Sequence, residues 1–216
     1  MDIAIIGAGN VGRALATSFE RAGHDVIIAS RDSEDAGAVA SATRSRVAIS
    51  NLEAARAAEI IVLAIPFASA AAVATEIRDV VAGKPVVDVS NRMSFGPTGP
   101  VLEAGESNAE QLAVWLPEAS VIKAFNTLFA SNQADPIAEG IQLDGFVAGD
   151  DALAKAKILE LVQSIGLHPV DVGPLSRAQQ LEQLAFLNIA LNVTGGGAWQ
   201  SGWKLVGAPA PALVAA

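Results

Sequence analysis

The chain has 216 residues with a formal net charge of −9, and 51% of the residues are hydrophobic. An acidic chain without a basic cluster disfavours binding to nucleic acid or to an anionic membrane, and the length suits one large domain with at most a small appendage. The chain has no cysteine and only two histidines, so thiol nucleophiles are excluded and we expect no metal site. No apolar run reaches membrane-spanning length and Met1 leads directly into the first predicted strand, so we expect a cytoplasmic protein.

A buried strand, a glycine-rich turn and a helix open the chain. The apolar residues Ile3 to Ile6 run into Gly7-Ala8-Gly9-Asn10-Val11-Gly12, and an amphipathic helix follows as far as Gly23. In such a sequence the first glycine allows a tight turn, the second admits a pyrophosphate close to the backbone and the third lets the helix pack on the strand. The free N–H groups of the helix then face the phosphates. The pattern predicts a dinucleotide site, and a glycine turn without a ligand is the less favoured alternative.

The end of the second predicted strand, over 25–30, indicates which dinucleotide binds. In NAD sites an Asp or Glu follows this strand and accepts hydrogen bonds from the ribose hydroxyls. Here Ser30 and Arg31 stand instead, a hydroxyl and a guanidinium that suit a 2′-phosphate, so we predict NADP(H). Two alternatives stay open: Arg31 could be an ordinary exposed arginine, and Asp32 could approach a ribose or repel the phosphate.

Helices and strands alternate through the rest of the first 172 residues. The sequence predicts helices over 33–45, 52–58 (capped by Asn51), 68–81, 108–116 and 150–164, strands over 47–49, 59–65, 84–90, 120–124, 145–148 and 167–172, and a loop over 93–105. This alternation predicts an α/β fold, a Rossmann-type domain with a doubly wound, mostly parallel sheet over residues 1–172. Phe67, just beyond the strand over 59–65, could lie over the cofactor or in the core.

Residues 173–216 are predicted to form a C-terminal helical extension. A long helix from Arg177 to about Thr194 carries apolar residues around most of its circumference. A helix of this kind must be buried on several sides, which one domain rarely achieves for a terminal helix. We therefore predict that this segment forms a homodimer interface and one wall of the acceptor site.

The chain resembles the family of NADPH-dependent oxidoreductases of the deazaflavin coenzyme F420, the F420-dependent NADP oxidoreductases. The resemblance covers nearly the whole chain, and the matching motifs are IIGAGNVG (5–12), ASR (29–31), VLAIPF (62–67), VVDVSN (86–91), VIKAFNT (121–127) and PVDVGPLSRAQQLEQLA (169–185). The resemblance implies direct hydride transfer between nicotinamide C4 and the deazaflavin ring. Such a transfer needs two stacked rings and neither a catalytic side chain nor a metal.

The resemblance also assigns cofactor-binding residues by position. It implies that the pyrophosphate is held by Gly7, Ala8, Gly9, Asn10, Val11 and Gly12 and that the 2′-phosphate is held by Ser30 and Arg31. The dinucleotide would be bordered by Ala64, Ile65, Pro66, Phe67 and Asn91, and the nicotinamide end by Ala124, Phe125 and Asn126.

Two positions depart from the family pattern. Asp32 stands where a second basic residue is common, and Arg92 stands where a proline often follows the asparagine. Because the deazaflavin carries a phosphate and glutamates, its pocket should offer positive charge, for which the candidates are Arg92, Lys123, Arg177 and Lys204. The alternatives are a reductase of another small acceptor, such as a flavin, a ferric chelate or an imine, and a non-catalytic NADP(H)-binding sensor.

Overall fold

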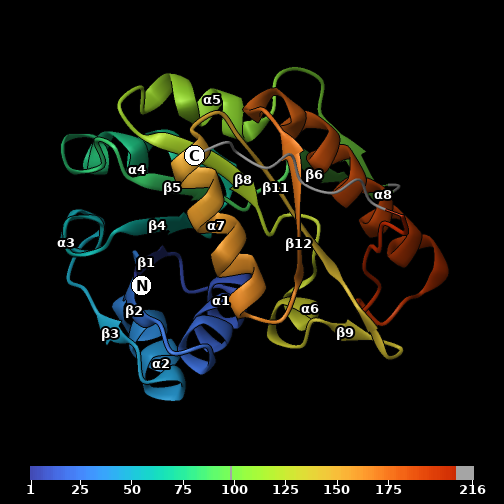
Figure 1. Ribbon diagram of the computed structural model, residues 1–216, viewed down its shortest axis with the longest axis horizontal. Helices are drawn as coiled ribbons and strands as arrows, with labels where there is room; N and C mark the ends of the chain where they lie inside the picture. Colours follow the sequence, from blue (N-terminus) through green and yellow to red (C-terminus); the bar gives the residue numbers. More distant parts are fainter. Residues whose placement is uncertain (98, 208–216) are drawn as a thin grey trace.

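The computed structural model describes residues 1–97 and 99–207, so residues 208–216 of the predicted extension lie outside it. Its centre is an eight-stranded sheet in the order β12-β11-β8-β5-β4-β1-β2-β3 (Figure 1). All neighbouring strands run parallel except β11, which is antiparallel to β8. The predicted mostly parallel, doubly wound sheet is confirmed. Its strands are β1 (Asp2–Ile6), β2 (Asp25–Ala29), β3 (Arg46–Val47), β4 (Ile60–Leu63), β5 (Pro85–Asp88), β8 (Ser120–Ala124), β11 (Asp144–Gly149) and β12 (His168–Gly173).

Helices cover both faces of the sheet. They are α1 (Asn10–Arg21), α2 (Ser33–Thr43), α3 (Asn51–Ala57), α4 (Ala70–Ile77), α5 (Asn108–Trp115), α6 (Ala130–Ala134), α7 (Ala152–Ser164) and α8 (Ala178–Gly195). Side chains alternate along β1, so that Ile3 and Ile5 pack with α1, α2 and α7, whereas Ala4 and Ile6 pack with α3, α4 and α5. Because both faces are covered, the strands are apolar throughout and their carboxyl ends form the exposed edge where a ligand can bind.

Three local expectations differ from the structure. The predicted loop over 93–105 contains a hairpin, β6 (Met93–Gly96) and β7 (Gly99–Leu102), in which Pro100 faces Phe95 across the pair. The glycines and prolines that favoured a loop lie within this hairpin. The segment between β8 and β11, for which we predicted no elements, holds α6 and a small hairpin of β9 (Ile137–Ala138) and β10 (Ile141–Gln142). The cap of α3 is Ser50 rather than Asn51, because the Ser50 hydroxyl accepts a hydrogen bond from the Glu53 N–H.

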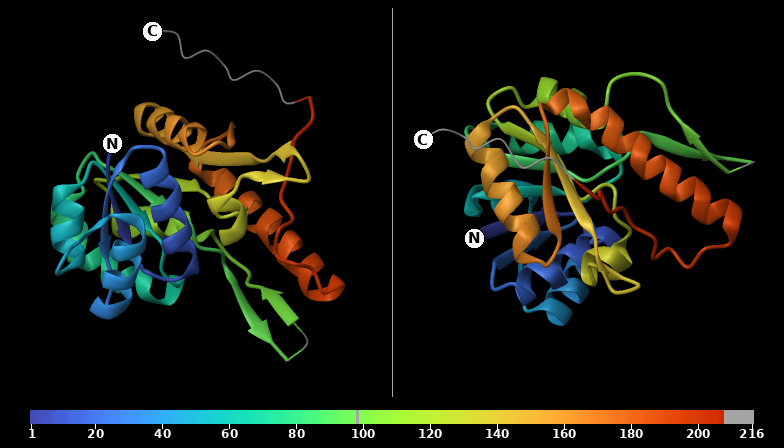
Figure 2. Two further views of the ribbon diagram at one scale, coloured as in Figure 1. Left: turned by 90° about the horizontal axis from the view of Figure 1, so that it is seen from below. Right: turned by 45° about the vertical axis from the view of Figure 1, so that its right-hand side comes forward.

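The C-terminal helix α8 leaves the sheet and lies beside the β6–β7 hairpin. Figure 2 shows the two elements projecting together from the body of the molecule. Within this chain α8 buries only one side, and the apolar side chains Leu187 and Leu191 are 49% and 59% exposed. Phe95 of the hairpin is 70% exposed. Among the described residues, no helix has the length and apolar character needed to span a membrane.

The chain after α8 returns to the sheet and is anchored on Asp144 at the start of β11. The fully buried carboxylate of Asp144 accepts hydrogen bonds from Lys204 Nζ (2.8 Å), from His168 Nδ1 (2.8 Å) and from the Leu205 N–H. Burial acts to raise the pKa of Asp144, but the Leu205 N–H, Lys204 and His168 outweigh it and hold that pKa below its usual range. This anchor therefore depends on an ionised carboxylate.

Lowering the pH is expected to remove the stabilisation that the ionised Asp144 provides. A carboxylate with a lowered folded-state pKa stabilises the protein above its unfolded pKa, about 4, and this contribution is lost as the pH falls through the folded-state value. The free energy of unfolding of the wild type should therefore decrease below about pH 4 more steeply than that of Asp144→Asn. Urea unfolding between neutral pH and that range measures both slopes. Identical slopes would contradict the anchoring role of this carboxylate.

Candidate functional site

A cavity of about 590 Å³ lies where the carboxyl ends of β1, β4 and β5 meet the start of α1. Three segments that are far apart in the sequence line most of it, and each follows one of these strands. The lining residues are Gly9, Asn10, Val11, Ala64, Ile65, Pro66, Phe67, Ala68, Val89, Ser90, Asn91, Arg92, Met93, Glu103 and Asn108. The glycine loop, Ala64 to Phe67 and Asn91 are thus brought together as the sequence predicts.

The three glycines of the loop have different structural roles. Gly7 has φ of +118°, and a Cβ there would collide with the backbone of Ala64. A Cβ on Gly12 would collide with the carbonyl oxygen of Gly7, so this glycine allows α1 to sit against the loop. A Cβ on Gly9 would meet no atom within 4 Å, and this residue faces the open cavity.

The start of α1 is suited to an anion. Gly9 is its N-cap, no side chain in the described part of the chain caps it, and its first turn carries no acidic residue. The N–H groups of that turn and the positive end of the helix dipole therefore lack the side-chain partners that usually satisfy them. Together with the open space at Gly9, this arrangement fits the pyrophosphate of a dinucleotide.

Ser30 and Arg31 follow β2, one strand beyond the glycine loop, and lie outside the cavity lining. The Arg31 side chain is exposed. Asp32, whose role was open, caps α2: its carboxylate accepts hydrogen bonds from the N–H groups of Glu34 (2.9 Å) and Asp35 (3.5 Å). The Asp32 carboxylate therefore points to the start of α2. This leaves Arg31, and not Asp32, as the residue predicted to face the ribose and its 2′-phosphate.

Phe67 stands at the β4 side of the cavity and belongs to none of the core clusters, so its place over a cofactor stays a prediction. It lines the cavity and is half-buried. Its ring also stacks on Trp115 of α5, with centroids 5.6 Å apart and an interplanar angle of 22°. The indole holds the phenyl ring in place at the cavity wall.

Asn91 and Asn126 join the ends of β5 and β8. Asn91 Nδ2 donates to the backbone oxygen of Asn126 (3.2 Å), and Asn126 Nδ2 donates to Asn91 Oδ1 (2.8 Å). Oδ1 of Asn126 is buried without a partner. Ala124 and Phe125 do not line the cavity but are buried behind it, where Phe125 packs edge-on against Phe19 at 5.8 Å. Asn126 does not line the cavity either, so the assignment of these three residues to the nicotinamide end stays a prediction.

The four basic candidates for the acceptor pocket do not stay together. Arg92 lines the cavity, and Arg177 is exposed just before α8. Lys204 pairs with Asp144 at the start of β11 and lines a different cavity, so its assignment to one pocket with Arg92 was wrong. Lys123 was also wrongly assigned, because its side chain is fully buried below the cavity.

Lys123 belongs to an ionic cluster that sequence reasoning missed. Its Nζ lies 2.6 Å from Asp88 Oδ2 and 2.7 Å from Glu182 Oε1, and these two carboxylate residues are 4% and 2% exposed. Burial raises the pKa of Glu182, and the ammonium of Lys123 opposes that rise. The sequence does show three charged residues within apolar segments, namely the strands β5 and β8 and the helix α8. Nothing in it indicated that these residues contact one another.

Replacing Lys123 with methionine is expected to reduce the free energy of unfolding by about 3–5 kcal/mol, because it leaves two buried carboxylates without their counter-ion. Lys157→Met provides the matched control, since Lys157 forms an ion pair with Glu59 at the surface. That control should cost less than about 1 kcal/mol. Urea unfolding of both variants at neutral pH gives the comparison. Similar losses of unfolding free energy in the two variants would show that the buried cluster contributes no more stability than the surface ion pair.

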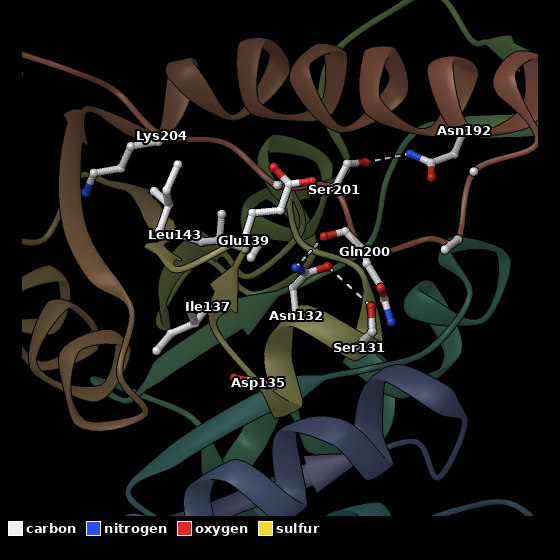
Figure 3. Close-up of a pocket in the computed structure, with 15 residues that line it drawn as sticks. Ser131, Asn132, Asp135, Ile137, Glu139, Leu143, Asn192, Gln200, Ser201 and Lys204 are labelled. Atoms are coloured by element: carbon white, nitrogen blue, oxygen red, sulfur yellow. Dashed lines mark hydrogen bonds between the residues drawn. The ribbon is translucent and has the colours of Figure 1, made fainter.

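A second cavity of about 650 Å³ lies between α6, the β9–β10 hairpin and the segment 197–204 (Figure 3). Of the residues that the sequence assigned to the cofactor or to the acceptor, only Lys204 lines it. Its polar side chains bind other parts of the chain, as where Asn132 Nδ2 donates to the Gln200 oxygen (2.8 Å) and Asn192 Nδ2 to Ser201 Oγ (2.7 Å). No group of three or more acidic or histidine side chains within residues 1–97 and 99–207 is arranged to hold a metal ion. The first cavity is therefore the candidate active site.

Known proteins are similar to this chain over the same regions. The family model described as "NADP oxidoreductase coenzyme F420-dependent" matches residues 2–92. The F420-dependent NADP reductase of Methanothermobacter thermautotrophicus is 33% identical over 209 residues, covering 89% of this chain and 90% of that protein. Metalloreductase STEAP3 of Rattus norvegicus is 33% identical over 188 residues, covering 84% of this chain, which spans only 36% of that longer protein.

A solved structure agrees with the relatives in fold. A protein from Arthrobacter sp. FB24, provisionally described as an F420-dependent NADP reductase, superposes with a TM-score of 0.84 and 32% identity, covering 93% of this chain and 97% of that one. This chain and the Arthrobacter protein thus share one fold over nearly their whole length. With that coverage at this level of identity, the chain belongs to the family of F420-dependent NADP oxidoreductases.

Proposed function

We propose that this protein is an NADP(H)-dependent oxidoreductase that exchanges a hydride directly with the deazaflavin coenzyme F420. The observation that carries the proposal is the continuous cavity from the glycine loop to Asn91 and Arg92, in a chain 33% identical to an F420-dependent NADP reductase over 89% of its length. The Gly9 opening and the uncapped start of α1 supply the pyrophosphate site that such a cofactor requires.

The strand order supports one direction for the bound dinucleotide. β2, which leads to Ser30 and Arg31, is on one side of β1, and β4 and β5 are on the other. With the 2′-phosphate at Arg31 and the pyrophosphate at Gly9, the nicotinamide falls between Ala64–Phe67 and Asn91. Bound NADPH supplies the hydride from nicotinamide C4, and its transfer requires ring stacking at about 3–3.5 Å rather than an acid, a base or a metal.

Arg92 is the basic side chain that lines the cavity beyond Asn91. Its Nη1 donates to the Glu106 backbone oxygen (2.7 Å), which holds the guanidinium against the loop that follows the β6–β7 hairpin. A cation at this place attracts an acceptor with a phosphate and carboxylates on its side chain. We propose Arg92 as the residue of this chain that steers the deazaflavin toward the nicotinamide.

We also propose that the two parts of the chain have different roles. Residues 1–172 bind NADP(H), and the segment 173–216 forms a homodimer interface and a wall of the acceptor site. The exposed Leu187, Leu191 and Phe95 on neighbouring elements support the interface, because large apolar side chains gathered at a surface favour association. Sedimentation equilibrium that shows only monomers at micromolar concentration would contradict it.

An acceptor panel tests the proposed reaction. NADPH and enzyme should bleach oxidised F420, and flavins, ferric chelates and imines should react far more slowly. The match to a metalloreductase favours a ferric complex as the second candidate, which the same panel would reveal by faster ferric reduction. Tight NADPH binding without turnover of any acceptor would instead indicate a sensor.

A further inference from the structure

The buried cluster around Lys123 connects helix α8 with the segment that borders the nicotinamide end of the cavity. Besides receiving the Lys123 ammonium, Glu182 of α8 accepts two backbone hydrogen bonds. Its Oε1 binds the Asn108 N–H (2.8 Å), and its Oε2 binds the Arg92 N–H (3.2 Å). One carboxylate on α8 therefore holds a backbone group of the cavity lining.

The same segment is held from the side of β5. Oδ1 of Asp88 accepts hydrogen bonds from the Ser90 N–H (3.0 Å) and the Ser90 hydroxyl (2.6 Å). Lys123 Nζ donates to the Ser90 carbonyl oxygen (2.6 Å), and Asn108 Nδ2 donates to the Ser90 hydroxyl (2.9 Å). Asn91 stands between Ser90 and Arg92, so both of its neighbours are fixed by the cluster, while its own amide is paired with Asn126.

Stability alone does not account for this arrangement. Taking three charges out of water is costly, and apolar residues of similar size often give equal or greater stability in such a place. What the cluster supplies is a fixed position for the backbone over 88–92. Hydride transfer depends on such fixing, since reacting groups must be held to within about 0.5 Å of the productive geometry.

We infer that Glu182 is a positioning residue, which acts through Lys123 and the Arg92 N–H to set Asn91 against the nicotinamide. This inference rests on the proposed NADP(H) function. Because β1 and β4 separate β5 from β2, the effect is confined to the nicotinamide half of the cofactor. Helix α8 is then part of the active site, although none of its residues lines the cavity.

The test compares two ligands that differ only in the nicotinamide ring. Isothermal titration of the full chain measures the Kd of NADP⁺ and of 2′-phospho-ADP-ribose, which keeps the 2′-phosphate and the pyrophosphate. Glu182→Gln should weaken NADP⁺ by about tenfold and 2′-phospho-ADP-ribose by less than about twofold. Glu160→Gln, which removes an exposed charge from α7, is the control and should change neither.

Equal weakening of both ligands would overturn the inference, because it would show a general structural effect. Unchanged binding of both would overturn it as well. If Glu182→Gln does not fold, Glu182→Asp keeps the charge with a shorter reach and should show the same selectivity to a smaller degree. No acceptor enters this measurement, so failure of F420 reduction would leave its result intact, and loss of the proposed reaction can be told apart from loss of this inference.

Discussion

Replacing Arg31 with alanine is expected to weaken NADPH binding by about 10- to 100-fold and NADH binding by less than about twofold. Charge-assisted hydrogen bonds to a phosphate contribute about 1.5–3 kcal/mol each, and one factor of ten in affinity corresponds to about 1.4 kcal/mol. NADH lacks the 2′-phosphate, so the substitution removes no contact with this cofactor. The structure supports this expectation by turning the neighbouring Asp32 carboxylate to the start of α2.

Fluorescence titration of the reduced nicotinamide measures both affinities. Arg46→Ala is the matched control, since Arg46 is also exposed but lies opposite Ile27 within β2, at the start of the edge strand β3, and not after the end of β2. This control should leave both cofactors unaffected. Equal losses of NADPH and NADH in Arg31→Ala would disprove the 2′-phosphate assignment.

Replacing Gly9 with valine is expected to reduce binding of NADPH and NADH alike by roughly 100-fold or more, the equivalent of at least about 2.7 kcal/mol. The fold should tolerate the change. Gly9 has φ of −72°, which any residue adopts, and a Cβ there meets no protein atom within 4 Å. The added side chain would fill the space at the start of α1 that the pyrophosphate needs.

The neighbouring glycine provides the contrast for this experiment. Gly12→Ala would place a methyl group against the Gly7 carbonyl oxygen and should lower the stability of the fold itself. Gly9→Val should stay within about 1 kcal/mol of the wild-type free energy of unfolding, as expected for exchanging an N-cap glycine. Urea unfolding and cofactor titration on both variants separate the two effects. Wild-type affinity in Gly9→Val would refute the proposed pyrophosphate site.

The sequence predicted the features of this protein that depend on neighbouring residues. The order of strand, glycine turn and helix over residues 2–21 is confirmed, because turn chemistry and apolar periodicity act within a few residues. The alternation of the later elements gave the mostly parallel sheet for the same reason. Ser30 and Arg31 could be singled out because their distance from the glycine loop is set by one strand–helix–strand unit.

Features that depend on distant residues could not be predicted. Lys123 and Glu182 are 59 residues apart, and no local pattern shows that β8 and α8 bring them together. Lys123 was assigned to the acceptor pocket because its charge was visible in the sequence while its burial was not. The β6–β7 hairpin was missed because it is stabilised by packing against α8, which overrides the loop signal of its glycines and prolines.

The proposed function depends on direct hydride transfer. An isotope label at nicotinamide C4 can follow this transfer. NADPH carrying deuterium at nicotinamide C4 is mixed with the enzyme and oxidised F420, separately for each of the two C4 positions. We predict that deuterium from one of the two positions appears in the reduced deazaflavin in equal amount to the NADP⁺ formed, without loss to water. Reduced F420 that carries no label from either of the two C4 positions, or no reduction of F420 by either form of NADPH, would contradict the proposed function.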